Sequence, residues 1–357
     1  MNDDDGPKRR GAGRKLLLVL CSLGLALGAA EVVLRVWFPV KYLQPVVRPP
    51  GHGWTDVIHQ PSSVPGLTYE LRPGASGREK DCTIAVNSLG MRGPELVQPK
   101  SNQMLRVAVL GDSVAFGFRV EAPEMFTARL AELLNGPPGR AHDYEVMNFA
   151  VTGYSAREEA SVLEHKALPL DPDLVVVAYY LNDPDFGPVN ALRMAFHRAE
   201  WWEHSELLRL CAQKAHQMEL ARSGGGDYFR WLHAQETDEW KSVPAAFARM
   251  HALADSRALR VVLAIFPVFA LDGKERKPFV TWDEYAYAPI HAQVRAAAEK
   301  EAFSVVDLLE VYRASGKAPQ ELARDADHPN ALGHALAAEA LAKLLLERHA
   351  ELFGTPR

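Results

Sequence analysis

The chain has 357 residues, of which 48% are hydrophobic and 24% charged, values that are ordinary for a globular protein with one large domain or two modest ones. Its 40 basic and 45 acidic residues give a formal net charge of −5, which argues against a nucleic-acid-binding protein, because such proteins need a basic surface. The sequence contains no C-x-x-C pair, H-E-x-x-H motif or EF-hand loop, so we expect no metal site.

The N-terminal segment has the composition of a membrane anchor. Residues 1–15 contain five lysines and arginines, and residues 16–38 are apolar apart from Glu31 and Arg35. A helix over residues 16–38 would be about 34 Å long at 1.5 Å per residue, which is enough to cross a bilayer. Because basic residues remain on the cytoplasmic side, we expect a cytoplasmic tail over 1–15 and a single-pass anchor over 16–38. The rest of the chain would then lie outside the inner (cytoplasmic) membrane, in the periplasm.

Other interpretations of this segment remain open. The tripeptide Gly28-Ala29-Ala30 is an acceptable cleavage site, so the segment could be a removable signal peptide. Cys21 suggests a lipoprotein, but the bulky Leu20 precedes it where a small residue is expected. A buried helix is the third alternative.

The three cysteines constrain the structure little. Cys21 belongs to the apolar segment, and Cys82 and Cys211 lie in the remainder of the chain. If this remainder is exported, Cys82 and Cys211 could form a disulfide. Two unpaired, partly buried thiols are the alternative.

Between the apolar segment and residue 104 the composition changes twice. Residues 39–66 are rich in proline and glycine, which predicts a linker. Residues 67–103 read as a small β segment, because 68–72 and 82–86 alternate or carry β-branched side chains and Pro73-Gly74 lies between them.

From residue 104 to about 350 the sequence alternates between strand and helix patterns. Short apolar runs predict strands at 105–110, 145–149, 174–180, 260–266 and 304–308. Ser155 and Glu158 form a capping box that opens a helix to about residue 168, and residues 331–349 have helical spacing of leucine and alanine. This alternation predicts a parallel sheet with helices on both faces.

One stretch interrupts the alternation. About 80 residues separate the third and fourth predicted strands, which is far more than a simple crossover needs. Within them, residues 186–242 contain four tryptophans and the run Ser223-Gly224-Gly225-Gly226. This insertion could be a lid or substrate-binding segment, or a structural subdomain with a small core of its own.

Ser113 is the candidate nucleophile. The sequence Gly111-Asp112-Ser113 follows the first predicted strand, and ligands of a parallel sheet gather at the carboxyl ends of its strands. A serine at this turn could attack a substrate, and its N–H, near a helix N-terminus, could bind a developing oxyanion. Alternatively, Asp112 and Ser113 only cap the helix.

Gly153 and Asn182 follow the second and third predicted strands. A glycine lets the backbone approach a ligand, and an asparagine amide can donate a hydrogen bond to an oxyanion. Each residue also has a simpler explanation. Gly153 could be an ordinary turn glycine, and Asn182 could form an Asx turn ahead of Pro184. Because all of these positions would share one sheet edge, the functional interpretation gains weight from the coincidence.

His328 lies between the last predicted strand and the last predicted helix, and it is the candidate base. In a serine hydrolase, histidine takes the proton from the serine, and an acid orients the ring and stabilises its charged form. Asp325 and Asp327 are both near. Asp325, three residues before the histidine, is the better candidate, because an adjacent side chain points away from the ring in most turns.

These residues resemble the sequence blocks of the SGNH (GDSL-type) hydrolase superfamily. The blocks are Gly111-Asp112-Ser113 with Gly117, Gly153, Asn182-Asp183, and Asp325…His328-Pro329-Asn330…Gly333-His334. The resemblance implies a three-layer α/β/α sandwich with a five-stranded parallel sheet (flavodoxin-like). It also implies Ser113 as nucleophile, His328 as base, Asp325 as orienting acid, and the Ser113 amide, Gly153 amide and Asn182 side chain as the oxyanion hole.

The segment 87–93 (Asn-Ser-Leu-Gly-Met-Arg-Gly) resembles the stretch that precedes this domain in membrane-anchored bacterial members. Together these patterns predict a membrane-anchored periplasmic serine esterase. Its substrate would carry an O-acyl or O-acetyl ester on an envelope carbohydrate or lipid, and its acyl-enzyme would form on Ser113 without a cofactor. Two alternatives stay open: an O-acyltransferase that uses the same triad, and a non-catalytic envelope-binding module, against which the intact Ser, His and Asp argue.

Overall fold

The computed structural model describes residues 8–43, 57–80, 82–136, 142–187, 191–196, 199–272 and 275–354. The chain divides into two compact units, one of residues 1–46 and 197–218, the other of residues 47–196 and 219–357. Residues 1–7 of the expected basic tail and residues 44–56 of the expected linker lie outside the described part.

The first unit contains the apolar helix. Helix α1 spans Lys8–Trp37, and the unit also contains the short helix η4 (Trp201–His204) and most of α7 (Glu206–Gly224). Residues 13–37 of α1 are long and apolar enough to span a membrane or to act as a signal sequence, with a mean hydropathy of 2.3 over the most apolar window. None of that window is buried, so the structure gives no support to the buried-helix interpretation.

The two charged residues near the end of α1 have partners within the same unit. The Glu31 carboxylate accepts hydrogen bonds from the Ser205 hydroxyl (2.9 Å) and from the backbone N–H groups of Glu206 and Leu207 (both 3.0 Å). Arg35 pairs with Glu31 at 2.7 Å. The carboxylate therefore caps the free N–H groups at the start of α7, where a helix dipole favours a negative charge.

The second unit is built on a five-stranded parallel sheet in the order β6-β5-β7-β8-β9. The strands are β5 (Met104–Gly111), β6 (Asp143–Asn148), β7 (Leu174–Tyr179), β8 (Arg260–Ile265) and β9 (Ser304–Asp307). Each expected strand is confirmed to within two residues at either end. Every residue of the central strand β7 is buried, as expected for a strand that is covered on both faces.

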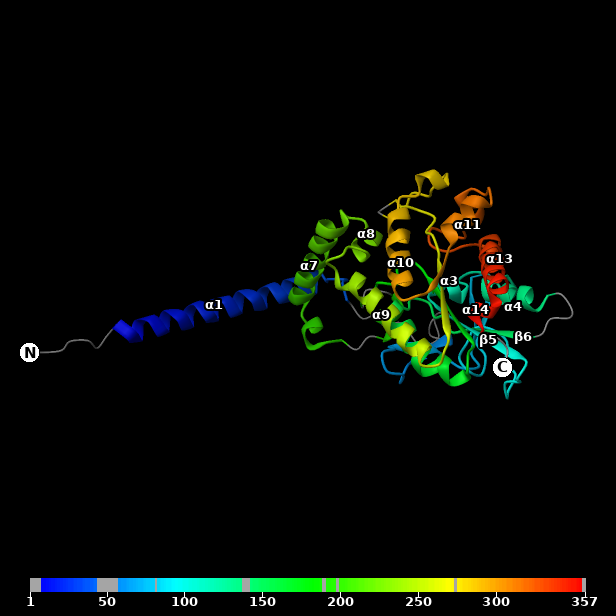
Figure 1. Ribbon diagram of the computed structural model, residues 1–357. Coiled ribbons are helices and arrows are strands. Elements are labelled where there is room, and N and C mark those ends of the chain that lie inside the picture. The colour runs from blue at the N-terminus through cyan, green and yellow to red at the C-terminus, as the bar shows by residue number, and fades with distance from the viewer. Residues whose placement is uncertain are drawn as a thin grey trace, which may run out of the picture. The chain divides into compact units, whose positions relative to one another are not determined.

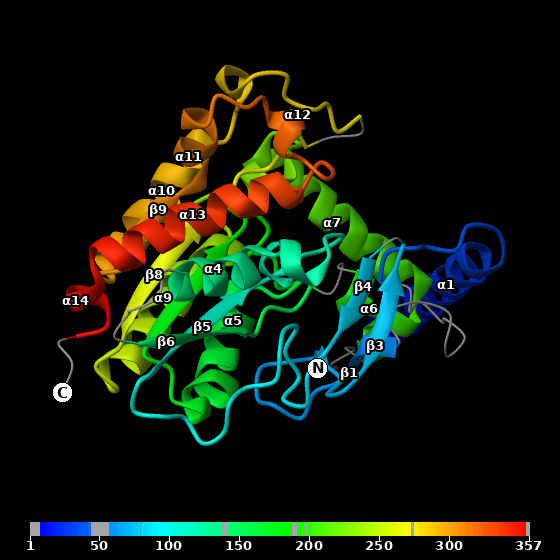
Figure 2. The same ribbon diagram turned by 90° about the vertical axis from the view of Figure 1, so that its right-hand side faces the viewer.

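Helices cover both faces of this sheet (Figures 1 and 2). On one face α4 (Phe126–Asn135) packs against α13 (Ala331–Glu347), and α11 (Leu308–Ala314) packs against α13. On the other, α9 (Asp238–Asp255) lies between α5 (Ala156–Val162) and α10 (Ala288–Lys300). This arrangement follows from right-handed crossovers, because the chain reverses direction across the sheet after β6. The predicted three-layer α/β/α fold is confirmed.

Short elements complete the unit. They are α3 (Ser113–Phe116), η1 (Ala122–Glu124), η2 (Leu163–Ala167), η3 (Leu168–Leu170), α6 (Ala191–Phe196), α8 (Tyr228–Leu232), η5 (Trp282–Glu284), α12 (Pro319–Leu322) and α14 (His349–Leu352). The helix expected from Ser155 to residue 168 is not regular throughout. It widens into a π turn at η2 and tightens at η3, where Pro169 lacks the N–H that an α-helix would need.

The segment before the sheet forms two separate antiparallel pairs. Strand β1 (His59–Pro61) pairs with β2 (Tyr69–Leu71), and β3 (Ser76–Glu79) pairs with β4 (Cys82–Ala85). Strand β1 lies inside the range expected to be a linker. Cys82 is buried and Cys211 is exposed, and both are free thiols.

The insertion 186–242 contributes to both units. It contains α6, η4, α7, α8 and the start of α9. Its residues 197–218 belong to the first unit, and the rest belongs to the second. Residues 188–190, 197 and 198 lie outside the described part.

Arg92 fixes the segment 87–93 to the turn that follows α3. Its buried guanidinium donates hydrogen bonds to the carbonyls of Phe116 (2.9 Å), Gly117 (2.5 Å), Val120 (2.7 Å) and Thr83 (3.3 Å). Burial lowers the pKa of Arg92 to about 10, so the group stays charged at neutral pH. Four carbonyl acceptors compensate the burial of this charge.

We expect Arg92→Met to destabilise the second unit by about 3 kcal/mol or more, because the carbonyls of Phe116, Gly117 and Val120 would lose a charged donor. The melting temperature should fall by roughly 5–10 °C in a calorimetric scan. The control is Arg78→Met, since Arg78 is exposed and its side chain donates, within the described part of the chain, only to the nearby Lys80 carbonyl. Equal melting temperatures for the two variants would contradict the role of Arg92.

Candidate active site

The sharp turn at the end of β5 places Ser113 at the carboxyl edge of the sheet. Gly111 has φ +156°, and a Cβ there would lie 2.7 Å from the Ala115 Cβ, so only glycine fits. Asp112 caps the following helix α3 by accepting a hydrogen bond from the Val114 N–H at 2.8 Å. Ser113 therefore begins α3, and it keeps 6% of its surface exposed.

The structure joins Ser113, His328 and Asp325 in one chain of hydrogen bonds. The Ser113 Oγ lies 2.8 Å from His328 Nε2, and His328 Nδ1 lies 2.8 Å from Asp325 Oδ1. A neutral ring that donates its Nδ1–H to the carboxylate leaves Nε2 free to accept the serine proton. The Ser113 Oγ also lies 3.2 Å from Asp112, which is the longer of its two contacts.

Asp327 points elsewhere. Its carboxylate accepts a hydrogen bond from the Tyr180 hydroxyl at 2.9 Å and pairs with both terminal nitrogens of Arg276 at 2.5 and 2.8 Å. Of the two nearby acids, the one that contacts the His328 ring is Asp325.

Asp325 is held as a carboxylate. Burial raises its pKa, but hydrogen bonds from the His328 ring and from the N–H groups of Asp327 and His328 outweigh this and leave the pKa well below its usual range. Its second oxygen lies 3.2 Å from Arg119. The Arg119 guanidinium stacks over the Phe118 ring at 5.0 Å, and that ring lies 4.7 Å from the His328 ring. These contacts restrict the orientation of the imidazole.

Gly153 and Asn182 follow the strands on either side of β5. The Val151 N–H bonds to the Gly111 carbonyl at 3.2 Å, so the Gly153 loop lies beside the Ser113 turn. Gly153 has φ +80°. Among the described residues, the N–H groups of Ser113 and Gly153 have no hydrogen-bond acceptor. The Asn182 side chain lies close enough to Asp112 to lower the pKa of that carboxyl, although burial outweighs this and raises it.

Tyrosine hydroxyls tie the Gly153 loop to strand β2. The Tyr69 hydroxyl donates to the Thr152 carbonyl at 2.7 Å, and the Tyr154 hydroxyl donates to the Tyr69 carbonyl at 2.6 Å. Both rings are buried. The small β segment therefore braces the backbone on both sides of Gly153.

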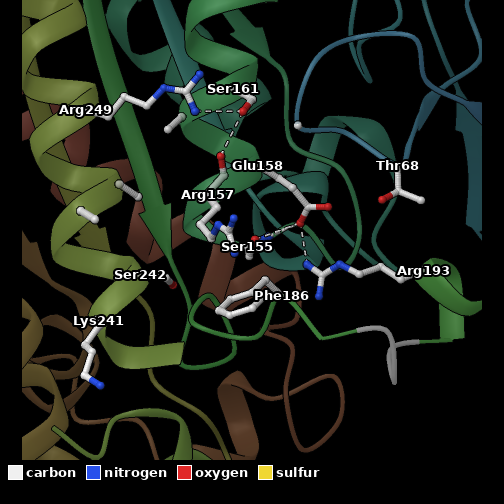
Figure 3. A pocket seen from close by; sticks show the side chains of 14 residues that line it. Thr68, Ser155, Arg157, Glu158, Ser161, Phe186, Arg193, Lys241, Ser242 and Arg249 are labelled. Carbon is white, nitrogen blue, oxygen red and sulfur yellow. Dashed lines mark hydrogen bonds and ion pairs between the residues drawn. The ribbon is translucent and has the colours of Figure 1, made fainter. Parts of the chain in front are cut away.

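Arg193, on α6 in the insertion, joins the Gly153 loop to the loop that carries Asn182. Its guanidinium donates to the Gly153 carbonyl at 2.8 Å and to the Asp185 carbonyl at 2.6 Å, and it pairs with Glu158 at 2.5 Å. Figure 3 shows this ion pair at the start of α5. Only 5% of Arg193 is exposed, so the contacts form away from water.

The roles of Tyr69, Arg92 and Arg193 were not predicted from the sequence. Arg92 lies in the segment whose family resemblance was noted, which was the only available signal for it. Tyr69 lies in a run that predicts a strand, and Arg193 lies in the irregular insertion. Contacts between residues so far apart leave no periodic pattern in the sequence.

Buried carboxyl groups lie behind the serine turn. Asp112, Glu159 and Asp183 are almost completely buried. Burial raises the pKa of Asp112, and for Glu159 and Asp183 burial together with repulsion from neighbouring carboxyls, including Asp112, raises the pKa well above its usual range. The interior thus favours the protonated form of Glu159 and Asp183.

His334 is unsuited to act as a base. Its ring is buried against Phe126, and its Nδ1 accepts the Phe126 N–H at 3.2 Å. Burial lowers its pKa to about 3, so the ring stays neutral at ordinary pH. Its contacts tie α13 to the start of α4.

Within the described ranges, no group of three or more His, Cys, Asp or Glu side chains could hold a metal ion. At this edge of the sheet, Ser113 supplies a hydroxyl, His328 an imidazole and Asp325 a carboxylate, beside the amide donors of the neighbouring loops.

Comparison with known proteins identifies the family. Residues 109–336, more than half of the chain, match the model of the GDSL-like lipase/acylhydrolase family. No curated protein matches the chain.

Several solved structures are similar. One is a protein of the G-D-S-L family from Desulfitobacterium hafniense (15% identity, TM-score 0.42, 67% of this chain and 99% of that chain covered). Another is an acetylxylan esterase from Geobacillus stearothermophilus (16% identity, TM-score 0.39, 70% of this chain and 94% of that chain covered). A third is a two-domain esterase active on acetylated mannans (15% identity, TM-score 0.41, 68% of this chain and 49% of that chain covered).

The family match begins near the end of β5 and covers the other four strands of the sheet, and it includes Ser113, Gly153, Asn182, Asp325 and His328. The chain therefore belongs to the GDSL-like lipase/acylhydrolase family and is a hydrolase that acts on ester bonds.

Proposed function

We propose that the chain hydrolyses a carboxylic ester through an acyl-enzyme on Ser113, with His328 as general base and Asp325 as its orienting acid. The observation that supports this assignment is the hydrogen-bonded chain from the Ser113 Oγ through His328 to Asp325, with 2.8 Å at each contact. Alcohols are poor nucleophiles at neutral pH, and a base within hydrogen-bond distance makes the hydroxyl reactive by taking its proton.

In the first half of the reaction, the Ser113 Oγ attacks the ester carbon while His328 Nε2 takes its proton. The N–H groups of Ser113 and Gly153 and the Asn182 amide stabilise the resulting oxyanion. When the intermediate collapses, the C–O bond to the alcohol breaks, and the alcohol leaves with the proton from His328. In the second half, His328 activates water, which releases the acid and restores Ser113.

For the substrate, we propose an O-acyl or O-acetyl ester on an envelope carbohydrate or lipid. We further propose that residues 16–38 remain as a single-pass anchor in the inner membrane, after a cytoplasmic tail of residues 1–15. The hydrolase domain, residues 104–350, would then be periplasmic. The apolar helix and the basic residues before it support this placement.

The first test of the mechanism is Ser113→Ala. We expect it to lower kcat for short p-nitrophenyl esters by about 10,000-fold or more, because no other group can form the acyl-enzyme. Ser256→Ala, at the end of α9, is the control and should retain full activity. Full activity in folded Ser113→Ala protein would rule out the mechanism.

The choice of acid is tested by comparing Asp325→Asn with Asp327→Asn. We expect Asp325→Asn to lower kcat by roughly 1,000-fold or more, because an amide cannot stabilise the imidazolium ion. Asp327→Asn should cost less than about tenfold, because it only replaces the partner of Arg276 and Tyr180. Steady-state kinetics on both purified variants decides, and the reverse ranking would assign the role to Asp327.

Arg193 is a positioning residue for the Gly153 loop, and Arg193→Lys tests it. A lysine cannot reach the Gly153 and Asp185 carbonyls together, so the Gly153 N–H should shift from its place near Ser113. We expect kcat to fall by roughly 10- to 100-fold in the folded fraction, with KM changed less than about threefold. Arg249→Lys, which keeps a pairing with Glu164, is the control. A loss of folded protein with unchanged kcat would show a purely structural role.

The anchor is tested with a C-terminal alkaline phosphatase fusion and N-terminal sequencing of the mature protein. We expect an active reporter, resistance to high-salt extraction from membranes, and an N-terminus at Met1 or Asn2. The cost of Glu31 and Arg35 is lowered by their position near one end of the span. A soluble protein that begins at Glu31 would indicate a cleaved signal, and an inactive reporter would contradict export.

A further inference from the structure

A cavity separate from Ser113, His328 and Asp325 lies in the same unit as these residues. It has a volume of about 600 Å³ and lies between α5, α9, the segment around Thr68 and Phe186 (Figure 3). This volume is in the range of small-molecule sites. Its lining includes none of Ser113, His328 and Asp325.

The lining of this cavity is strongly basic. It contains Arg157, Arg193, Lys241 and Arg249, and its only acidic residue is Glu158. Glu158 is already paired with Arg193. Three positive charges therefore remain around the cavity of a chain whose formal net charge is −5.

These three cations are available to a ligand. Arg157 has no carboxylate within ion-pair distance among the described residues, and its guanidinium stacks over the Phe186 ring at 4.5 Å. Lys241 donates a hydrogen bond to the Glu236 carbonyl at 2.7 Å and pairs with Asp238, whose side chain is 85% exposed. Arg249 pairs with Glu164, and both side chains are substantially exposed. Such exposed pairs contribute little, so an anion can replace them.

Hydroxyl groups and one aromatic ring complete the lining. Thr68, Ser161 and Ser242 supply hydroxyl oxygens. The Ser161 and Ser242 hydroxyls already donate to backbone carbonyls, so toward a ligand they serve as acceptors. The ring of Phe186 lies beneath Arg157 in Figure 3. Guanidinium groups bind carboxylate or phosphate in a two-pronged geometry, whereas hydroxyl side chains suit the hydroxyls of a sugar.

We propose that this cavity binds an anionic sugar, that is, a saccharide that bears a carboxylate or a phosphate. Arg157 and Lys241 hold the anion, and the hydroxyl side chains bind the sugar ring. Arg193 lines the cavity and also donates to the Gly153 carbonyl, so the occupant would lie beside the Gly153 loop.

Calorimetric titration of the full-length protein in detergent tests this site. The probes are glucuronate and glucose 6-phosphate, with glucose as the uncharged comparison. We expect saturable binding of at least one anionic sugar and a Kd for glucose that is at least about tenfold weaker. The double variant Arg157→Gln/Lys241→Gln should raise the Kd of that anionic sugar by about tenfold or more.

The matched control is Lys343→Gln/Arg348→Gln, which removes the same charge from exposed positions on and after α13 and should leave the Kd unchanged. Thermal unfolding curves establish that both double variants are folded.

Inorganic phosphate and glycerol 3-phosphate serve as further probes. If they bind as tightly as glucose 6-phosphate, the sugar ring is not recognised and the proposal fails in favour of a plain phosphate or lipid-headgroup site. Absence of binding, equal binding of glucose, or an unchanged Kd in the Arg157→Gln/Lys241→Gln protein would also overturn it.

Discussion

Hydrogen bonds from buried guanidinium groups to backbone carbonyls hold the loops around Ser113 in place. Arg92 binds the carbonyls of Phe116, Gly117 and Val120, and Arg193 binds those of Gly153 and Asp185. Loops have no ladder of hydrogen bonds of their own, so their carbonyls need other donors when they are buried. An arginine presents several donors in one plane and can therefore fix two chain segments relative to each other.

In the protein interior, the direction in which a pKa shifts depends on the hydrogen-bond partners of the group. Asp325 accepts several hydrogen bonds, so its carboxylate form is favoured despite burial. Glu159 and Asp183 lack comparable donors and face other acids, and their pKa values rise. His334 is buried without an acid partner and stays neutral. The pKa values of the same residue type therefore shift in opposite directions within one domain, because hydrogen bonding decides whether burial is compensated.

The sheet could be predicted from the sequence because its signals are local. Strands buried on both faces appear as short apolar runs, and their carboxyl ends give the positions of Ser113, Gly153 and Asn182. The contact of Asp325 with His328 was also foreseeable, since the two residues are three positions apart in the sequence. Strand β1 and the contacts of Tyr69 and Arg193 were not, because they depend on segments that meet only in the folded chain. The irregular end of the α5 segment shows how tertiary packing and Pro169 override a helical pattern.

Arg193 also limits which sequence changes the insertion can tolerate. Insertions between strands are usually the parts that vary most freely, and exchanging them is a common way to alter what an enzyme accepts. Here the insertion supplies a hydrogen bond to the Gly153 carbonyl. A transplanted loop that lacks an equivalent arginine would reshape the surroundings of the substrate and loosen the Gly153 loop at the same time. Evolutionary drift or engineering of this segment is therefore restricted to sequences that keep α6 and its guanidinium in register with the sheet.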